Sequence, residues 1–340
     1  MMKTVHIHLP WNEKRFPSLF RQTPKELGIW NDYEFHINSD TKSCDYLVIF
    51  AGQTSIIKKQ VHPKNTLFIA GEPPSIRKYP DAYLAQFEYV ISSDGETIHP
   101  NKQSFQQGYP WFCGVQFTQD GNRSSVKNYD DFKQDNDIQK TKLMSVVCSD
   151  KKEKPGHRKR HEFVMRLKEV FGDDLDVYGR GHNPIIDKSD AIRPYKYHIA
   201  IENSSTPDYW TEKLSDCYLE EAFPVYAGCP NLEDYFDKDA FLDINLDAFE
   251  ESTQRIRNAI NNDQHLHSSL AIKEAKRKIL DEYNLFNLIS NHATKTAVDL
   301  EKPLHNFKAY PRRYFSNGLL YKMKLALREL AKEILTHSKR

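Results

Sequence analysis

Hydrophobic and polar positions in the first hundred residues alternate over short runs that polar segments separate. The runs rich in β-branched or aromatic residues predict strands at 4–9, 33–37, 45–50, 66–69 and 88–91. Strands of this length and spacing, with room for crossovers between them, are typical of one Rossmann-like half of an α/β protein.

The second half continues the same alternation with clearer helices. Strands are predicted at 143–148, 176–178, 197–201, 224–226 and 241–244, and helices from Arg160, from Thr211, at 249–262 and at 272–288. Between Gln106 and Lys142 the chain is polar with few apolar anchors, which is typical of a domain boundary. We therefore predict Rossmann-like domains at 1–138 and 139–300, followed by a tail at 301–340.

The tail reads as one long amphipathic helix from Ser316. Its apolar stripe is Leu319, Leu320, Met323, Leu327, Leu330, Ala331 and Ile334, flanked by Lys322, Lys324, Arg328 and Lys332. From residue 301 onward ten Lys and Arg face three Asp and Glu, a net charge of +7, while the rest of the chain carries −6. Such a helix can lie on an anionic membrane surface through 316–340, or pack on the body with a solvated basic face.

Composition excludes several protein classes. The 340 residues hold 48 Lys and Arg against 47 Asp and Glu, so net charge favours no partner class, and we expect no nucleic-acid partner. No run approaches the roughly 20 apolar residues of a membrane span, so a cytoplasmic protein is expected. The five cysteines are scattered and never form a CxxC spacing, which argues for reduced thiols and against a structural zinc.

Two motifs imitate metal sites. His6 and His8 share a strand face, and Asp174-Leu175-Asp176 imitates a metal-binding DxD motif. Packed histidines and solvated strand ends are the commoner explanations, since no third ligand stands at a suitable spacing. We expect no metal.

The stretch 195–214 carries the densest candidate chemistry. It predicts a strand, a polar loop and a helix, with Glu202, Asn203, Tyr209, Glu212 and Lys213 where the strand ends and the helix begins. Ligands bind at the carboxyl ends of strands in open α/β sheets, and a helix start attracts phosphate. A lysine in the first turn opposes the helix dipole unless an anion lies beside it. A solvated helix start is the alternative.

Glu72 is the candidate on the other half. The strand at 66–69 runs into Gly71-Glu72-Pro73-Pro74, and the two prolines stiffen the turn just past the carboxylate. A catalytic residue would suit that place, although a surface glutamate in a turn is the simpler interpretation of the residues alone.

The run ENSSTPDYWTEKLSDCYLEEAFPVYAGCPN, residues 202–231, resembles the signature block of the α-1,3-fucosyltransferases, glycosyltransferase family 10. The resemblance rests on many residues at fixed spacing and is strongest over 143–244. The shared residues are Tyr195, Lys196, Glu202, Asn203, Ser204, Tyr209, Thr211, Glu212, Lys213, Pro224, Val225, Gly228 and Pro230.

The resemblance implies a GT-B fold, with two facing Rossmann-like domains and a cleft between them. It also implies inverting transfer of L-fucose from GDP-fucose to an oligosaccharide or glycolipid acceptor, with α-1,3 linkage to GlcNAc or Glc, in bacterial surface glycan synthesis. Glu72 becomes the implied general base. Arg160, in an R-x-x-F pattern with Phe163, becomes a diphosphate contact.

The same resemblance assigns the remaining candidates. Asn203 and Lys213 would face the charge that builds on the diphosphate, Glu212 would accept from the ribose hydroxyls, and Tyr209 would line the donor pocket. No metal is implied. The loops 52–64 and 93–108 are expected to select the acceptor. A different nucleotide sugar, or a non-catalytic glycan-assembly scaffold, remains an alternative.

Overall fold

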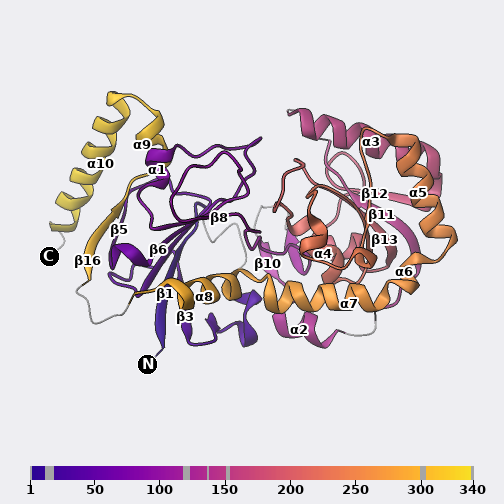
Figure 1. Cartoon of the computed structure of the whole chain (residues 1–340), viewed down its shortest axis with the longest axis horizontal. Helices are drawn as coiled ribbons and strands as arrows, with labels where there is room; N and C mark the ends of the chain where they lie inside the picture. Colours follow the sequence, from indigo (N-terminus) through magenta and orange to yellow (C-terminus); the bar gives the residue numbers. More distant parts are fainter. Residues whose placement is uncertain are drawn as a thin grey trace. The chain divides into compact units, whose positions relative to one another are not determined.

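The computed structural model describes residues 2–11, 19–117, 123–135, 138–150, 154–298 and 304–337. The chain folds into two compact units, each built around a parallel sheet with helices, so the predicted α/β class is confirmed (Figure 1). The first unit holds Met1–Pro10, Asp32–Ser104 and His292–Arg340, and the second holds Trp11–Asn31 and Phe105–Asn291.

The sheet of the first unit runs in the order β3-β1-β4-β6-β7-β8, with every neighbouring pair parallel. The strands are β1 (Lys3–His8), β3 (Tyr33–Ile37), β4 (Tyr46–Phe50), β6 (Thr66–Ile69), β7 (Tyr89–Ile91) and β8 (Lys102–Gln103). The chain starts in the middle and builds outward in both directions, so the order reverses between β1 and β4. In a doubly wound sheet this reversal marks the ligand-binding edge.

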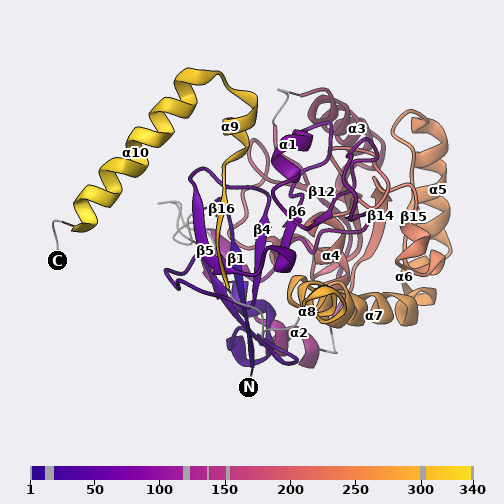
Figure 2. The ribbon, with the colours of Figure 1, turned by 60° about the vertical axis from the view of Figure 1, so that its left-hand side comes forward.

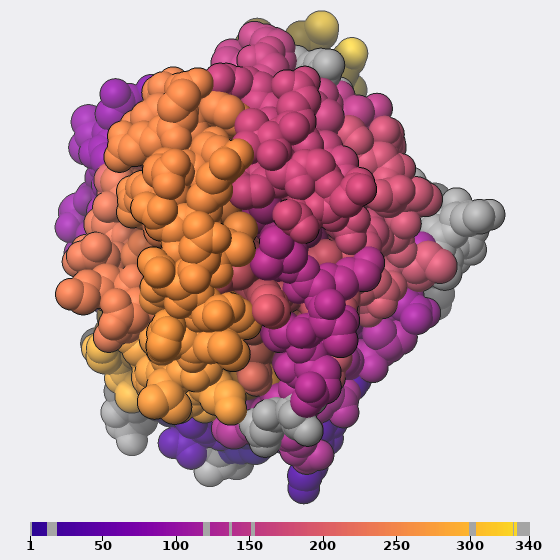
Figure 3. All heavy atoms as spheres, turned by 90° about the vertical axis from the view of Figure 1, so that its right-hand side faces the viewer, coloured from indigo at the N-terminus to yellow at the C-terminus, as the bar shows by residue number. Residues whose placement is uncertain are grey.

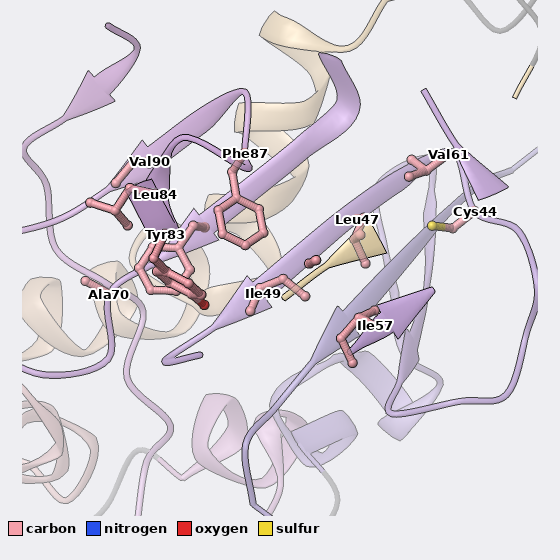
Figure 4. Close-up of a cluster of buried hydrophobic side chains, with 12 residues drawn as sticks. Cys44, Leu47, Ile49, Ile57, Val61, Ala70, Tyr83, Leu84, Phe87 and Val90 are labelled. Carbon is pink, nitrogen blue, oxygen red and sulfur yellow. The ribbon is translucent and has the colours of Figure 1, made fainter. Parts of the chain in front are cut away.

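Burial of β4 on both faces explains its unbroken apolar sequence, YLVIF. The core beside it draws on distant strands and on helix α1 (Asp81–Leu84) (Figure 4). Phe68 packs against Tyr83 and Phe87 with ring centroids 5.3 and 5.5 Å apart. The buried members are Cys44, Leu47, Ile49, Ile57, Val61, Phe68, Ala70, Tyr83, Leu84, Phe87, Val90 and Ala309. Each large apolar side chain so buried contributes roughly 1.5–3 kcal/mol.

Two additions extend the first unit. Strand β5 (Ile57–Val61) pairs antiparallel with β16 (His305–Ala309), nearly 250 residues later, and helices α9 (Arg312–Ser316) and α10 (Leu319–His337) follow. In Figure 2, α10 projects away from the sheet.

The predicted tail helix is therefore present as α10, and residues 301–303 and 338–340 of the predicted tail lie outside the described ranges. The described leucines and methionine of its apolar stripe are exposed, with Leu319 74%, Met323 55% and Leu327 64% exposed, while the side chains of Lys332 and Ile334 lie outside the described part. None of the helices in the described ranges is long and apolar enough to cross a bilayer.

The second unit repeats the topology in the order β12-β11-β13-β14-β15, again all parallel. Its strands are β11 (Lys142–Val147), β12 (Leu175–Tyr178), β13 (Tyr195–Ile201), β14 (Phe223–Ala227) and β15 (Leu242–Asp243). The order reverses between β11 and β13. Because such crossovers are right-handed, α3 (Pro155–Phe171) and α4 (Glu212–Leu219) cover opposite faces.

Helices close the second unit on the side seen in Figure 3, where the orange surface of α5 (Phe249–Asn261) and α7 (Ser269–Arg277) lies beside the pink surface of α3. The other elements of this unit are β2 (Ile29–Trp30), β9 (Val115–Phe117), β10 (Arg123–Ser125), α2 (Tyr129–Gln134) and α6 (Gln264–His267). Helix α8 (Leu285–Thr296) begins in the second unit and ends in the first.

Several predicted boundaries move. The polar stretch 106–142 is no linker: within it β9, β10 and α2 fold onto the second unit, and Trp111, Cys113 and Phe132 are buried. The units divide at Ser104 and Phe105 instead, and the tail belongs to the first unit, which differs from the predicted domains 1–138, 139–300 and 301–340. The polar side chains of this stretch conceal these three buried positions, two of them aromatic.

The bounds of two helices also differ from those that the hydrophobic periodicity predicted. The helix predicted at 272–288 is interrupted by a π-helical turn, Lys278–Glu282, after which α8 begins at Leu285. Asn284 causes the restart, because its Oδ1 accepts from Phe286 N and its Nδ2 donates to Gln22 O. Helix α3 starts five residues before Arg160, at Pro155, a residue favoured in a first turn.

Candidate functional site

The carboxyl edge of the second sheet encloses a hollow of about 530 Å³. It lies past the ends of β13, β14 and β15 and is closed by the first turns of α3, which is where a doubly wound sheet binds its ligand. Its lining residues are Gly156, Lys159, Glu202, Asn203, Ser204, Ser205, Ala227, Gly228, Cys229, Pro230, Leu232, Glu233, Phe241, Asp243, Ile244, Asn245, Leu246 and Asp247.

Helix α3 presents a basic N-terminus to this hollow. Pro155 occupies its first turn, no side chain caps the helix from Lys154, and no acid stands in the first turn. A Cβ at Gly156 would lie 2.4 Å from the Asn203 carbonyl oxygen, so only glycine allows the helix start to approach the end of β13 so closely. The unpaired N–H groups of a helix start and its positive dipole end suit an anion.

Arg160 and Asn203 meet at this edge, as the topology predicted. The Arg160 Nη1 donates to Asn203 Oδ1 at 2.8 Å, and the arginine is only 9% exposed. Its Nε is buried and has no hydrogen-bond partner within the described residues. A buried donor without a partner costs roughly 1–3 kcal/mol, so this guanidinium retains capacity for an acceptor.

Lys213 is paired inside the protein. Its Nζ donates to Glu202 Oε2 at 3.0 Å and to Thr211 Oγ1 at 3.1 Å, and the Glu202 side chain is fully buried. Burial lowers the pKa of the Lys213 ammonium, but the Glu202 and Glu212 carboxylates raise it by more, so its pKa lies above the ordinary value. The opposition between Lys213 and the helix dipole is therefore offset by a protein carboxylate.

Thr211 and Glu202 shape the start of α4. Thr211 caps the helix, and both its backbone N and its Oγ1 donate to Glu202 Oε1 at 2.8 Å. Glu212 follows in the first turn. Burial raises the pKa of the Glu212 carboxyl, but the charges of Lys213 and Lys188 lower it by more, so its pKa lies below the ordinary value.

The loop before α4 is fixed by hydrogen bonds between Asp208 and Asn231, which the sequence analysis did not predict. Asp208 adopts a left-handed φ of 60°, which is strained for a residue other than glycine. Asn231 holds it from both sides: Asp208 N donates to Asn231 Oδ1 and Asn231 Nδ2 donates to Asp208 Oδ1, each at 2.9 Å. Tyr235 Oη adds a third bond at 2.7 Å. Tyr209, next in the loop, is buried with its ring against Tyr109.

Glu72 lies in the first unit, at the carboxyl edge of β6. The Pro73 carbonyl accepts from Ile76 N and Arg77 N, which closes the turn after Glu72. A Cβ at Gly71 would come within 2.1 Å of the Ala51 Cβ, so glycine lets the end of β6 approach the end of β4. Glu72 is half-buried and lies three residues past the end of β6, the strand that pairs with β4.

The structure thus brings Arg160 and Asn203 together, and Asn203 lines the hollow. Arg160, Tyr209, Glu212 and Lys213 are not among its lining residues. Sequence reasoning missed Lys159, Asp243, Asn245 and Asp247. Asp243 ends β15 and Asn245 and Asp247 follow it, so the carboxyl-edge rule applied to every strand could have found these three, whereas Lys159 lies on α3. Among the described residues, no group of three or more His, Cys, Asp or Glu could hold a metal ion.

Comparison with known proteins connects this site to a family. Residues 138–270 match the model of "Glycosyltransferase family 10 (fucosyltransferase) C-term". Human 4-galactosyl-N-acetylglucosaminide 3-alpha-L-fucosyltransferase FUT6 is 41% identical over 75 residues, which is 21% of each chain. An Arabidopsis thaliana putative fucosyltransferase-like protein is 36% identical over 74 residues, 21% of this chain and 14% of that protein. The matched segment thus spans about a fifth or less of these curated relatives.

Solved structures with a similar outline include an alpha1,3-fucosyltransferase with GDP, at a TM-score of 0.48 and 16% identity over 83% of this chain and 92% of that one. An alpha-glucosyltransferase in complex with UDP and DNA gives 0.49 at 8% identity, over 86% of this chain and 99% of that one. Because both scores fall below 0.5, the fold description rests on the strand orders given above.

The matched residues contain the signature block, helix α3 and every strand of the second sheet. As the resemblance predicted, residues 138–270 match the C-terminal model of glycosyltransferase family 10, the fucosyltransferase family.

Proposed function

We propose that this protein is an inverting fucosyltransferase that moves L-fucose from GDP-fucose to a hydroxyl of an oligosaccharide or glycolipid acceptor. The expected linkage is α-1,3 to GlcNAc or Glc, in bacterial surface glycan synthesis. The observation that carries the proposal is the Arg160–Asn203 pair at the reversal point of the second sheet, inside the residues that match the family.

The donor diphosphate would lie at the start of α3. Gly156 in the first turn of α3 and Lys159, whose ammonium pairs with Asp247 at 2.6 Å, line the hollow, and Arg160 is bonded to Asn203 in its wall. A guanidinium makes charge-assisted hydrogen bonds to phosphate and keeps its proton, so it stabilises the charge that develops as GDP leaves. The volume of the whole hollow, about 530 Å³, falls in the range of small-molecule sites.

Because Lys213 is paired inside the protein, we propose a different role for it than direct contact with the diphosphate. Because its ammonium is bonded to Glu202 and Thr211, it contributes positive charge behind the wall and fixes the start of α4. Glu212 and Tyr209 support the same wall. Direct contacts of these three residues with the donor are not needed for the proposal.

Glu72 would act as the general base. Its carboxylate takes the proton of the acceptor hydroxyl while that oxygen forms a bond to the anomeric carbon. The bond from that carbon to the β-phosphate oxygen breaks, and GDP leaves with the electron pair from the opposite face. Base catalysis of this kind contributes roughly 10²–10⁴-fold. Because fixed cations neutralise the leaving group, no metal is proposed, and turnover should persist in EDTA.

The exposed apolar stripe of α10, flanked by Lys322, Lys324 and Arg328, supports peripheral contact with an anionic membrane. The proposed place of action is the cytoplasmic face of the cell membrane, where a glycolipid acceptor would be within reach.

Purified protein incubated with GDP-fucose and a panel of GlcNAc- and Glc-terminated acceptors tests the proposal. Transfer with α stereochemistry, read by NMR, is expected, whereas UDP-sugars should give none. Human proteins named as a 3-alpha-L-fucosyltransferase and a 4-alpha-L-fucosyltransferase are each 41% identical to this chain over 75 residues. The same NMR spectrum of the product therefore has to determine which hydroxyl carries the fucose. Transfer from a UDP-sugar, or no transfer with any donor, would overturn the proposal.

A further inference from the structure

The candidate donor hollow has two walls that come from separate loops. One wall is residues 203–205, which follow β13, and the other is residues 227–230, at and just past the end of β14. Asn231 comes next in the chain but is not among the lining residues. Its half-buried side chain is bonded to Asp208, a few residues beyond the first wall. An amide group therefore joins the two loops.

The Asn231 amide uses all of its hydrogen-bonding capacity. Its Oδ1 accepts from the Asp208 N–H at 2.9 Å and from the Cys229 thiol at 3.1 Å. Its Nδ2 donates to Asp208 Oδ1 and to Asp234 Oδ2, each at 2.9 Å. An amide has one carbonyl oxygen with two lone pairs and one NH₂ group with two donors, so each of these positions is occupied. A carboxylate or an apolar side chain of the same size could not form this set of bonds.

These bonds hold Asp208 in an uncommon conformation. Its φ of 60° lies in the left-handed region, which Asp and Asn visit more readily than other residues with a side chain. Tyr235 Oη, from the segment that follows Asn231, donates to Asp208 Oδ1 at 2.7 Å. The chain turns here before it enters α4, because Tyr209 N donates to the Thr206 carbonyl oxygen at 3.2 Å. The course of the loop that forms the first wall thus depends on groups that follow β14.

We propose that Asn231 is a positioning residue of the donor site, an inference that rests on the proposed function. By fixing Asp208, it keeps the wall at 203–205 in place beside the wall at 227–230 before the nucleotide sugar arrives. A site that is already formed loses less binding free energy to the ordering of its loops. Without these bonds a smaller fraction of molecules can bind, and the apparent dissociation constant rises by the same factor. Asn231 thus raises the affinity for the donor through other residues.

The variant Asn231→Asp tests this, because it keeps the size of the side chain but removes both N–H donors. At neutral pH the introduced carboxylate faces those of Asp208 and Asp234, and calorimetric titration with GDP should show roughly tenfold weaker binding than in the wild type. Asn261→Asp, at an exposed position of α5, is the matched control and should bind GDP as the wild type does.

The pH dependence separates positioning from general damage to the fold. The titratable and charged groups around this position are the carboxyls of Asp208 and Asp234, the Cys229 thiol, the Tyr235 hydroxyl and the Lys278 ammonium, which donates to the Tyr235 carbonyl oxygen. Burial raises the pKa of the thiol to about 11 and that of the hydroxyl above its ordinary value, so both keep their protons. As the pH falls to about 5, the carboxyl introduced by Asn231→Asp takes up a proton and can donate again, because neighbouring carboxylates raise its pKa. Its GDP affinity relative to that of the wild type should therefore recover.

Tyr235→Phe is a second, milder variant. It removes one bond to Asp208 and keeps the aromatic ring beside Trp210, so roughly threefold weaker GDP binding is expected. Hydrogen exchange of residues 203–209 in the free protein should also be faster in Asn231→Asp than in the wild type.

Equal GDP affinity of Asn231→Asp and the wild type, or a loss that is the same at neutral pH and at about pH 5, would overturn the positioning role while the proposed function stands. Wild-type protein that does not bind GDP would contradict the proposed function instead. Unchanged hydrogen exchange of residues 203–209 in Asn231→Asp would then overturn the positioning role as well.

Discussion

The two units share one strand order around their reversal points but differ in what stands at the carboxyl edge. In the second unit the edge holds a buried guanidinium, a buried carboxylate bonded to a lysine, and a basic helix start. In the first unit the acceptors of these bonds near the edge are neutral oxygens: Tyr83 Oη donates to Gln53 Oε1, and the Arg77 guanidinium and the Tyr79 hydroxyl donate to the Ala51 carbonyl oxygen. Glu72 is the acid at the end of β6.

The difference teaches that topology alone does not assign a role to either half. Both sheets have the same doubly wound order, so each has a carboxyl edge where a ligand could bind. The side chains at that edge distinguish them: those of the second sheet suit a diphosphate, and those of the first sheet suit a proton acceptor. The family match, residues 138–270, lies within the second unit, so the role of the first unit rests on Glu72 and is the part most worth testing.

Glu72→Gln should have the largest effect. Removing the proposed base is expected to lower kcat roughly 10²–10⁴-fold with donor affinity unchanged, because the amide keeps the shape but cannot take the proton. Steady-state kinetics with GDP-fucose measure kcat, and calorimetric titration with GDP measures the affinity for the nucleotide. Glu88→Gln, a half-buried acid at the start of β7, is the matched control. Equal losses in both variants, or none, would remove the base from the first unit.

Lys213→Ala should mainly destabilise the second unit. It leaves Glu202 buried without its partner, which costs roughly 3–5 kcal/mol. Adding Glu202→Gln should recover part of that loss, because the buried charge is removed. Urea unfolding of both variants decides the question, with Lys273→Ala as a surface control. A Lys213→Ala variant of full stability that binds GDP weakly would instead make this lysine a direct phosphate contact.

Arg160→Ala should weaken GDP binding roughly 10- to 100-fold, since hydrogen bonds to charged groups contribute about 1.5–3 kcal/mol. Arg160→Lys should recover only part, because an ammonium cannot reproduce the planar donor geometry. Arg166→Gln, on the same helix and paired with Glu250 at the surface, is the control for charge. Undiminished affinity after Arg160→Ala would place the diphosphate elsewhere.

Acid should lower the free energy of unfolding of both units, by less than the substitutions above. Burial, followed by the charge of Lys59, lowers the pKa of His6 to about 3 and of His8 to about 4 in the first unit. Burial lowers the pKa of His198 to about 3 in the second. The unfolded chain therefore binds protons below pH 6.5 that the folded chain does not, so stability falls as pH falls from about 6.5 towards 4.

Each such histidine contributes about 1 kcal/mol of that loss between pH 7 and pH 5.5. His198→Asn should flatten the pH dependence of the unfolding free energy, whereas His267→Asn, at an exposed position, should not. An unchanged slope after His198→Asn would show that this histidine does not remain neutral in the folded state.

The sequence predicted the sheet strands well because their signal is local. Strands 33–37 and 66–69 match β3 and β6, and the second sheet follows within about two residues. Strand β5, IKKQV, was missed because two lysines interrupt its apolar pattern and its partner β16 lies far along the chain. The early start of α3 was missed because basic residues conceal the first turn after Pro155.

The sequence predicted which residues gather at the candidate site, but it did not predict which of them bond to one another. Glu202, Asn203, Arg160 and Lys213 do gather at one edge, since strand ends and helix starts are set by local pattern. That Lys213 pairs with Glu202, rather than facing the hollow, depends on the fold of the loop from Asn203 to Trp210. Asn231 fixes that loop from over twenty residues away, and no local pattern signals this bond.

Hydrogen exchange of the full-length protein with and without GDP tests the central claim most directly. The account predicts that GDP protects residues 154–160, 203–206 and 243–247, and that Arg160→Ala abolishes this protection at the same GDP concentration. Protection confined to other segments, or identical protection in the Arg160→Ala variant, would contradict a donor site at the carboxyl edge of the second sheet.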